Sequence, residues 1–229
     1  MDMLQLREKE IFDTLKEIKR FKFVVIGGYA VGAYTLPRFS VDCDIVVEDS
    51  SELKNIGENL KKIGYIKKEA DEVSTSYGGE FVRYEKELEN SFKASIDILF
   101  KDVLDRQTNS TFSARWVFEN SVLRMLKGKT ITEMISLRVI NPDALIAMKS
   151  TSCRIADIRD VFMLAANVKD EEWVRKEIGR RCNAGERFKK IKDKIGSKQF
   201  KDDLQGVYGY IDQKLFEKHN QHILELFEI

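Results

Sequence analysis

The sequence predicts an α+β protein in two parts: a mixed β-sheet with helices packed on it in residues 1–140, and a helical lobe in residues 141–229. Two observations carry this prediction. Up to residue 140, apolar runs of strand length alternate with amphipathic helical segments, whereas the pattern from Asn141 onward is helical throughout. No flexible linker separates the parts, so we expect two lobes that close a cleft.

The first predicted elements are a helix, a strand, a short helix and a second strand. Residues 3–20 place apolar side chains on one side of a helix. The apolar run 23–26 is typical of a buried strand, and it ends at Gly27-Gly28. Small and aromatic residues then suit a short helix, which Pro37 ends. The second strand covers residues 42–47.

The later segments extend the sheet and then give way to helices. We expect a helix over residues 49–63 and a loop or hairpin tip over residues 70–80. Residues 92–100 alternate as a strand, and residues 122–131 have the pattern of a hairpin. Asn141 is the predicted N-cap of the first helix of the second part, because Pro142 follows it at the first helical position.

Asp42 and Asp44 form the first candidate site. Side chains of a strand alternate between its faces, so both carboxylates point the same way, with backbones roughly 6–7 Å apart. They repel each other, and a bound cation removes that repulsion. Hard oxygen ligands suit Mg²⁺ or Mn²⁺, which also accept phosphate oxygens as ligands. The alternative interpretation is a solvated strand end or a helix N-cap.

Gly27 and Gly28 are candidates for phosphate binding, because glycines after a strand let backbone N–H groups approach an anion at a helix N-terminus. A dinucleotide-binding turn would need glycines at positions 27, 29 and 32; Gly27 and Gly32 are present, but Tyr29 has a side chain that blocks close approach to the pyrophosphate. A P-loop is excluded because no Gly-Lys-Ser/Thr follows. An ordinary turn is the alternative interpretation.

Asp97 is the third candidate acid. It lies in an alternating strand pattern, where it shares a face with Ser95 and Leu99. An acid among apolar residues is costly to bury without a partner. Asp97 therefore either pairs with a basic residue or binds a cation.

The combination of strand, Gly-Gly, short helix and Arg38-x-Ser40-x-Asp42-x-Asp44 resembles the nucleotidyltransferase superfamily that includes DNA polymerase beta. Within it, the stretch is most similar to the minimal and AbiEii-type nucleotidyltransferases. The resemblance covers roughly residues 20–165. It implies that Gly27 and Gly28 hold a nucleoside triphosphate such as ATP, and that Asp42, Asp44 and Asp97 are catalytic and bind two Mg²⁺ or Mn²⁺ ions.

One departure from the superfamily pattern is at Gly28, where serine is more common and its hydroxyl can reach a phosphate. That contact must here come from the backbone or from another residue. Arg38 and Ser40, directly before the acids, are also predicted nucleotide-binding residues.

A second similarity to AbiEii-type proteins lies in the helical part, in the segment NPDALIAMK and the Asp-x-x-Asp pattern that follows it. It implies that Lys149 reaches the nucleotide phosphates and that Asp157 and Asp160 line the cleft. The alternative is that Lys149 is a solvated helix lysine and Asp157 a helix cap.

Composition narrows the class of protein and its compartment. The 43% apolar content allows a substantial core, and three scattered cysteines with two histidines exclude a zinc site. No apolar run approaches the ~20 residues of a membrane span, so we expect a cytoplasmic protein that does not contact membranes. The basic run over residues 175–201 makes RNA a candidate partner.

The predicted function is transfer of a nucleoside monophosphate from a nucleoside triphosphate to a hydroxyl of RNA, a protein or a small molecule. Some relatives are toxins, so the resemblance also permits an antitoxin-like partner. The alternative function is a non-catalytic RNA- or partner-binding protein on the same scaffold, although three retained acids argue against it.

Overall fold

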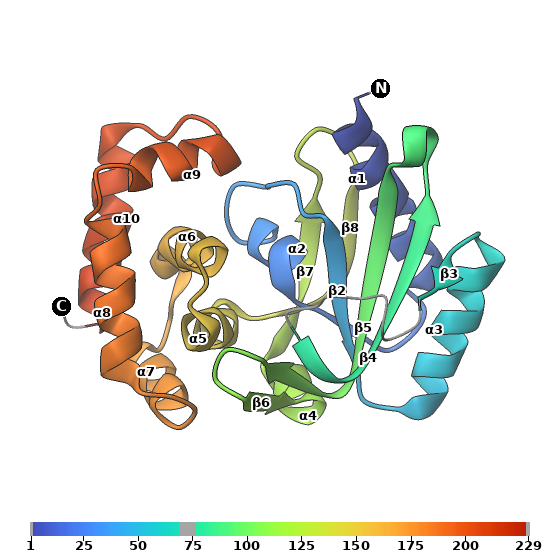
Figure 1. Ribbon diagram of the computed structural model, residues 1–229, viewed down its shortest axis with the longest axis horizontal. Coiled ribbons are helices and arrows are strands. Elements are labelled where there is room, and N and C mark those ends of the chain that lie inside the picture. The colour runs from blue at the N-terminus through green and yellow to red at the C-terminus, as the bar shows by residue number, and fades with distance from the viewer. Residues whose placement is uncertain (1, 69–76, 228–229) are drawn as a thin grey trace. The chain divides into compact units, whose positions relative to one another are not determined.

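The computed structural model describes residues 2–68 and 77–227 (Figure 1). By their internal contacts, two compact units are distinguished. The first unit consists of Met1–Ala33, Pro37–Leu104 and Thr111–Ile140, and the second of Tyr34–Leu36, Asp105–Ser110 and Asn141–Ile229, in each case within the described residues.

One mixed β-sheet is built in the order β3-β4-β5-β2-β1-β8-β7, and β6 pairs with β5. Parallel pairs join β2 to β5 and β1 to β8, and antiparallel pairs join β1 to β2 and β7 to β8. The mixed sheet confirms the predicted α+β class. The strands are β1 (Val24–Val25), β2 (Asp42–Val47), β3 (Ile66–Lys67), β4 (Tyr77–Glu87), β5 (Lys93–Asp105), β6 (Ser110–Ser113), β7 (Ser121–Lys127) and β8 (Met134–Ile140).

Four helices described in the first unit are α1 (Met3–Ile18), α2 (Gly27–Gly32), α3 (Ser50–Lys62) and α4 (Ala114–Glu119). Helix α1 contributes the fully buried Ile11, Phe12 and Leu15 to the core, as its amphipathic pattern predicts. Helix α3 packs beside α1, and α2 packs against β2 and β7.

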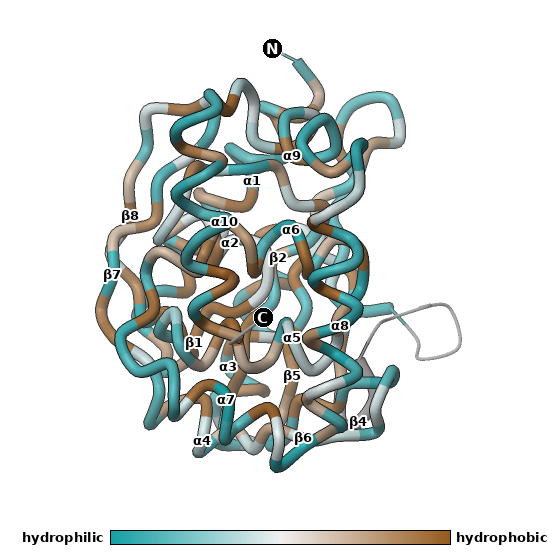
Figure 2. The backbone as a smooth tube through the Cα atoms, turned by 90° about the vertical axis from the view of Figure 1, so that its left-hand side faces the viewer, coloured by the Kyte–Doolittle hydropathy of each residue, from teal (hydrophilic) through white to brown (hydrophobic). Residues whose placement is uncertain are grey.

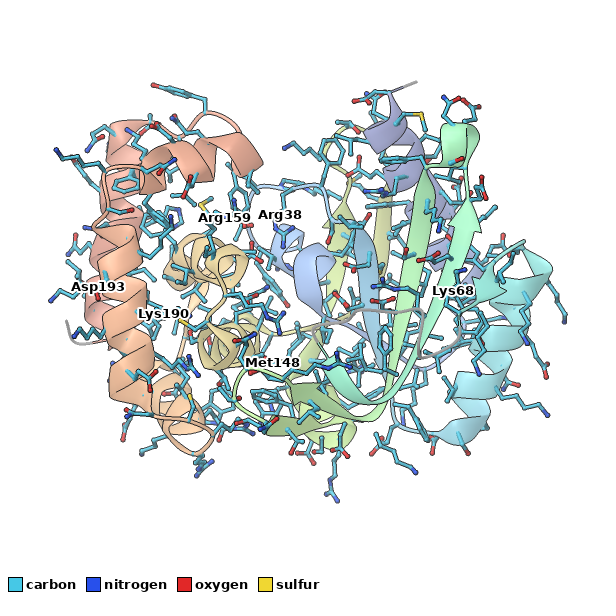
Figure 3. The ribbon with its side chains drawn as sticks, viewed as in Figure 1. Arg38, Lys68, Met148, Arg159, Lys190 and Asp193 are labelled. Atoms are coloured by element: carbon cyan, nitrogen blue, oxygen red, sulfur yellow. The ribbon has the colours of Figure 1, made fainter. Side chains whose placement is uncertain are left out.

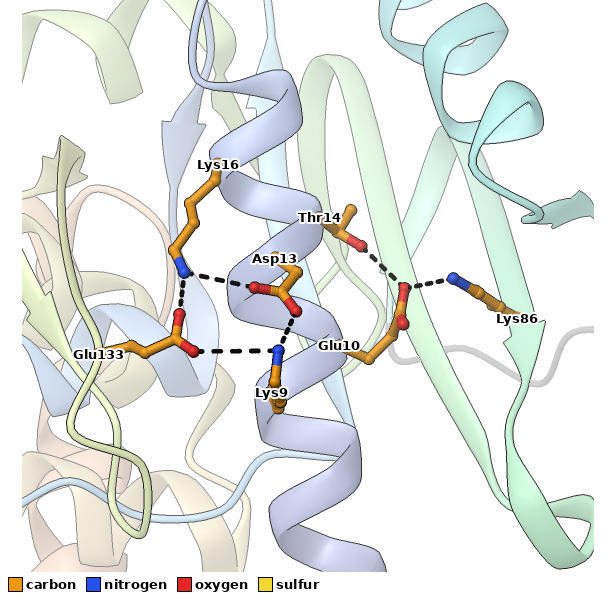
Figure 4. Close-up of polar contacts among 7 residues, drawn as sticks. All are labelled: Lys9, Glu10, Asp13, Thr14, Lys16, Lys86 and Glu133. Atoms are coloured by element: carbon orange, nitrogen blue, oxygen red, sulfur yellow. Dashed lines mark hydrogen bonds and ion pairs between the residues drawn. The ribbon is translucent and has the colours of Figure 1, made fainter.

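Ion pairs join α1 to β4 and to the residue before β8 (Figure 4). Glu10 accepts a hydrogen bond of 2.9 Å from Lys86 of β4, and Lys16 pairs with Glu133, which directly precedes β8. Side chains alternate along a strand, so Lys86 and Arg83 of β4 point to opposite faces of the sheet. The Lys86–Glu10 pair therefore anchors β4 from the face opposite Arg83.

The helices described in the second unit are α5 (Pro142–Ser152), α6 (Ile155–Leu164), α7 (Glu171–Gly179), α8 (Ala184–Ile195), α9 (Phe200–Tyr208) and α10 (Gln213–Phe227). Helix α5 is buried over most of its length, and α6, α7 and α8 pack around it. Hydrophilic and hydrophobic stretches alternate along α8 and α10 in Figure 2, as expected of helices with one buried face. Asn141 caps α5 as predicted, because its side chain accepts a hydrogen bond of 2.9 Å from the Ala144 N–H.

Several predicted boundaries were wrong. Helix α2 begins at Gly27 itself and ends at Gly32, five residues before Pro37. The second strand of the predicted hairpin begins at Met134, beyond the predicted end at residue 131. The loop predicted for residues 70–80 lies largely outside the described residues, but residues 77–80 already belong to β4.

The sequence predicts no membrane span. Within residues 2–68 and 77–227, none of the helices combines the length and the apolar character needed to cross a bilayer.

Candidate functional site

Strand register brings the three predicted acids onto one face of the sheet. In the parallel pair of β2 and β5, Asp44 lies opposite Asp97 and Asp42 lies opposite Ser95. Paired residues on adjacent strands share a face and are separated by about 4.8 Å across the strands. Asp44 and Asp97 are buried, at 6% and 2% exposure, and Asp42 is half-buried. The predicted convergence of these acids is therefore present in the first unit.

Arg83 of β4 lies among these carboxylates, and sequence reasoning did not name it. Its Nε donates to Asp97 Oδ1 at 2.8 Å and its Nη2 to Asp97 Oδ2 at 2.6 Å. The same Nη2 also donates to Asp42 Oδ2 at 3.2 Å. Of the two interpretations left open for Asp97, pairing with a basic residue is the one that this arrangement contains. We call Asp42, Asp44, Asp97 and Arg83 the strand cluster.

Gly27 is required by the close approach of Asp44. Its φ is +66°, in the region that favours glycine, and a Cβ there would lie 1.9 Å from Asp44 Oδ2. The backbone also connects the two segments, because the Ile26 N–H donates to the Asp44 carbonyl at 3.0 Å. The first turn of α2 and the acids of β2 are thus packed directly against each other.

Gly28 leaves room for the two polar residues that precede the acids. A Cβ at Gly28 would lie 2.5 Å from Ser40 Oγ and 3.0 Å from Arg38 Nη2. Figure 3 shows Arg38 beside α2. The Ser40 hydroxyl therefore occupies the space that a side chain at position 28 would need. This packing gives a physical reason for glycine here, and it places a hydroxyl beside the turn that lacks its own serine.

The second unit contains a separate group of charged side chains, which we call the helix cluster: Lys149 of α5 with Asp157 and Asp160 of α6. Lys149 Nζ lies 3.0 Å from Asp157 Oδ1 and 2.8 Å from Asp160 Oδ2. Tyr208 donates a further hydrogen bond to Asp160. The predicted helical spacing of three residues therefore directs both acids to the same lysine, which is buried rather than solvated.

The basic run over residues 175–201 is partly neutralised within the second unit. Arg175 and Lys176 pair with acids four residues earlier on α7, and Lys194 pairs with Asp203. Glu177 binds both Arg180 and Arg181. Lys189, Lys190, Lys192 and Lys198, on or next to α8, are exposed, as is Lys176 of α7.

A family model described as nucleotidyl transferase AbiEii toxin, type IV TA system, matches residues 13–219. The chain belongs to the AbiEii nucleotidyltransferase family. The match confirms the resemblance inferred from the motifs and the predicted nucleotidyltransferase class. No curated protein matches this chain.

Two solved structures are similar to the AbiEii chain. JHP933 from Helicobacter pylori is 17% identical, with a TM-score of 0.49, and the alignment covers 100% of this chain and 91% of JHP933. An antigenic nucleotidyltransferase-like protein from Paracoccidioides brasiliensis is 12% identical, with a TM-score of 0.48, and coverage is 95% of this chain and 98% of that protein.

Charge and burial shape the ionisation of the AbiEii strand cluster. Burial raises the pKa of Asp97 to about 6, although the Arg83 hydrogen bonds oppose the rise. The Asp97 hydrogen bonds raise the pKa of Arg83 further above its usual value. Cys43, between the two aspartates of β2, is fully buried, and burial together with the Asp44 and Asp42 charges raises the pKa of its thiol well above the ordinary value. The Cys43 thiol is therefore neutral.

The donor set of the strand cluster fits a divalent ion held by two carboxylates. Over residues 2–68 and 77–227, no group of three or more histidine, cysteine or acidic side chains could hold a metal ion. Mg²⁺ needs no such cage, because it is often bound through one or two carboxylates together with waters and substrate phosphates. Asp42 and Asp44 supply that pair. The metal roles predicted for Asp42, Asp44 and Asp97 stay predictions.

The sequence carried only a weak signal for Arg83. Its position in an alternating β-strand reveals that its side chain is on one face of that strand, but not which strand lies next to it. The strand that brings Asp97 to Arg83 is β5, which lies next to β4 in the sheet. The nucleotide-binding roles of Gly27, Gly28, Arg38, Ser40 and Lys149, and the cleft roles of Asp157 and Asp160, also stay predictions.

Proposed function

We propose that this AbiEii protein transfers a nucleoside monophosphate from a nucleoside triphosphate to a hydroxyl acceptor, with release of pyrophosphate and dependence on a divalent metal ion. One observation carries the proposal: three acids from two adjacent strands share a face beside the glycine that begins α2. The family supports the class of reaction. The metal and the substrates are the parts that we add.

Asp42 and Asp44 are the residues that would hold Mg²⁺ or Mn²⁺. Such an ion, when bound, neutralises the triphosphate and makes an approaching hydroxyl more acidic. The chain does the remaining work by positioning and charge. Gly27 and Gly28 let the backbone of α2 approach the phosphates, and Ser40 Oγ and the Arg38 guanidinium beside Gly28 bind them.

Asp97 is the proposed acceptor for the proton of the incoming hydroxyl. Its carboxylate lies opposite Asp44 on the neighbouring strand. A pKa of about 6 lies closer to neutral pH than that of an ordinary aspartate, which makes the carboxylate a stronger base. Oδ1 and Oδ2 of Asp97 both accept hydrogen bonds from Arg83, so the orientation of the carboxylate is fixed before substrate binds.

The acceptor class is an RNA, protein or small-molecule hydroxyl, and the surface of the second unit favours RNA. Lys189, Lys190 and Lys192 are exposed on α8 beside the exposed Glu186 and Asp193, and this net cationic face is one that phosphates can contact. Ile191 and Ile195 on the same helix are buried, so this cationic face is directed to solvent.

The biological role that we propose is that of a toxin, because the family description refers to type IV toxin–antitoxin systems. An antitoxin-like protein is the corresponding partner. Nucleoside triphosphates and reduced cysteines are both typical of the cytoplasm, where we place the protein.

The test is transfer of label. The full chain is incubated with each α-labelled nucleoside triphosphate, Mg²⁺ and either total RNA or cell lysate, and the labelled class is identified by RNase and protease digestion. We expect one acceptor class to take label, and the label to disappear on addition of EDTA and in Asp44→Ala. Equal labelling by wild type and Asp44→Ala would refute the proposal.

A further inference from the structure

Arg83 provides a positive charge inside the site where the sequence predicted two metal ions. Its guanidinium uses two nitrogens on the two oxygens of Asp97, which is a bidentate pair. One of those nitrogens also reaches Asp42 Oδ2. A single side chain thus joins the acid of β5 to the first acid of β2.

Separating the Arg83–Asp97 ion pair is energetically costly. The two side chains are only 18% and 3% exposed, so separation would leave a charge with little access to water. Arg83 cannot escape by losing its proton, because the pKa of a guanidinium is far above neutrality and Asp97 raises it further. On the opposite face of β4, the Lys86–Glu10 pair ties the strand to α1 and limits its movement.

The contacts of Arg83 favour one divalent ion over two. The guanidinium brings a positive charge to Asp97 and Asp42, the carboxylates that a second ion would need. A second divalent ion would have to share Asp97 or Asp42 with a guanidinium that already contacts both. A guanidinium and a divalent ion on the same carboxylate repel each other strongly where water is scarce.

We propose that Arg83 is a positioning residue that holds Asp97 and takes the place of a second metal ion, so that this chain binds one divalent ion with its nucleotide. The sequence predicted two ions, and the inference revises that number. It rests on the proposed function, because it concerns the same site and the same substrate. Arg83 fixes the Asp97 carboxylate and offsets the negative charge near it, while Asp42 and Asp44 bind the single ion.

The experiment counts bound ions. Mn²⁺ is titrated into the full chain in the presence of saturating non-hydrolysable ATP analogue, and free Mn²⁺ is measured by its electron paramagnetic resonance signal. We expect one Mn²⁺ in total per protein-bound analogue, after the Mn²⁺ held by free analogue is subtracted, for wild type and for Arg83→Lys, which keeps the charge. Arg83→Gln frees Asp97, so we expect a second Mn²⁺ to bind at least tenfold more tightly than to wild type.

The outcomes separate the inference from the proposed function. Two Mn²⁺ ions on wild type would overturn the role of Arg83 and leave metal-dependent transfer intact. Failure of wild type to bind either Mn²⁺ or the analogue would overturn both. An unchanged count of one in folded Arg83→Gln would show that Arg83 does not set the number. Should Arg83→Gln lose its fold by circular dichroism, Arg83→Lys decides: one ion supports the inference and two overturn it.

Discussion

The strand cluster and the helix cluster both hold carboxylates that repel each other beside one cationic side chain, but the two clusters differ in exposure to solvent. Each places two or more acids around one cationic side chain that comes from a different element. In the helix cluster, the side chains of Lys149, Asp157 and Asp160 are 10%, 10% and 2% exposed. In the strand cluster, Asp42 is 32% exposed and Arg83 is 18% exposed.

This difference in exposure indicates a binding role for the strand cluster and a stabilising role for the helix cluster. Asp42 keeps contact with solvent, so a ligand can reach the strand cluster without unfolding its surroundings. The helix cluster is closed, and its charges mainly satisfy each other. Similar charges therefore carry different expected roles, with chemistry in the strand cluster and structural support in the helix cluster.

The largest effect that we expect is on stability, from Lys149→Ala. It leaves two buried carboxylates without their shared cation, which costs about 3–5 kcal/mol of unfolding free energy. Urea denaturation measures the loss. Lys189→Ala, on the exposed face of α8, is the matched control and should change stability by less than about 0.5 kcal/mol. A loss below about 1 kcal/mol in Lys149→Ala would contradict the structural role.

Gly27→Ala tests the strand cluster through its packing. The new Cβ must displace the Asp44 carboxylate, and a displacement of the order of 1 Å at a reacting centre costs about a hundredfold in rate. Initial rates of label transfer measure this loss, with circular dichroism to confirm the fold. Gly206→Ala on α9, where a Cβ meets nothing within 4 Å, should keep the wild-type rate. Equal rates for both variants would remove Gly27 from the site.

The third expected effect is a pH dependence of stability that belongs to the strand cluster. Because burial raises the pKa of Asp97 from 3.8 to about 6, the folded chain takes up this proton more readily than the unfolded chain. The contribution of Asp97 to the unfolding free energy therefore rises as pH falls from about 6 to about 4, by up to about 3 kcal/mol. Metal-free wild type and Asp97→Asn are compared by urea denaturation from pH 7 to pH 4. A difference between them that does not change with pH would contradict this shift.

Local patterns predicted those parts of the site that depend on neighbours in sequence. Alternation along a strand was enough to place Asp42 and Asp44 on one face, and the spacing of Asp157 and Asp160 was enough to place them on one side of α6. Asn141 was recognisable as a cap because its side chain bonds only three residues away. The helical second part followed from the same periodicities, whereas the mixed sheet was expected from the resemblance to nucleotidyltransferases.

Contacts between distant segments could not be predicted in this way. Arg83 meets Asp97 because β4 lies next to β5, and strand order depends on the packing of the whole sheet. The reason for Gly28 is likewise visible only once Ser40 and Arg38 are seen against it. Helix ends were misplaced at Gly32 because a proline marks where a helix cannot continue, whereas a helix can end before it.

Cys43 offers a natural reporter for the strand that carries both aspartates. Cys43 lies between Asp42 and Asp44 in the strand, so its side chain points to the opposite face of the sheet. The residue is fully buried there. An alkylating reagent can reach the sulfur only when the side chains that cover this face of β2 move away. The rate at which the Cys43 peptide gains mass therefore measures local opening around this strand, with no foreign probe inserted near the carboxylates.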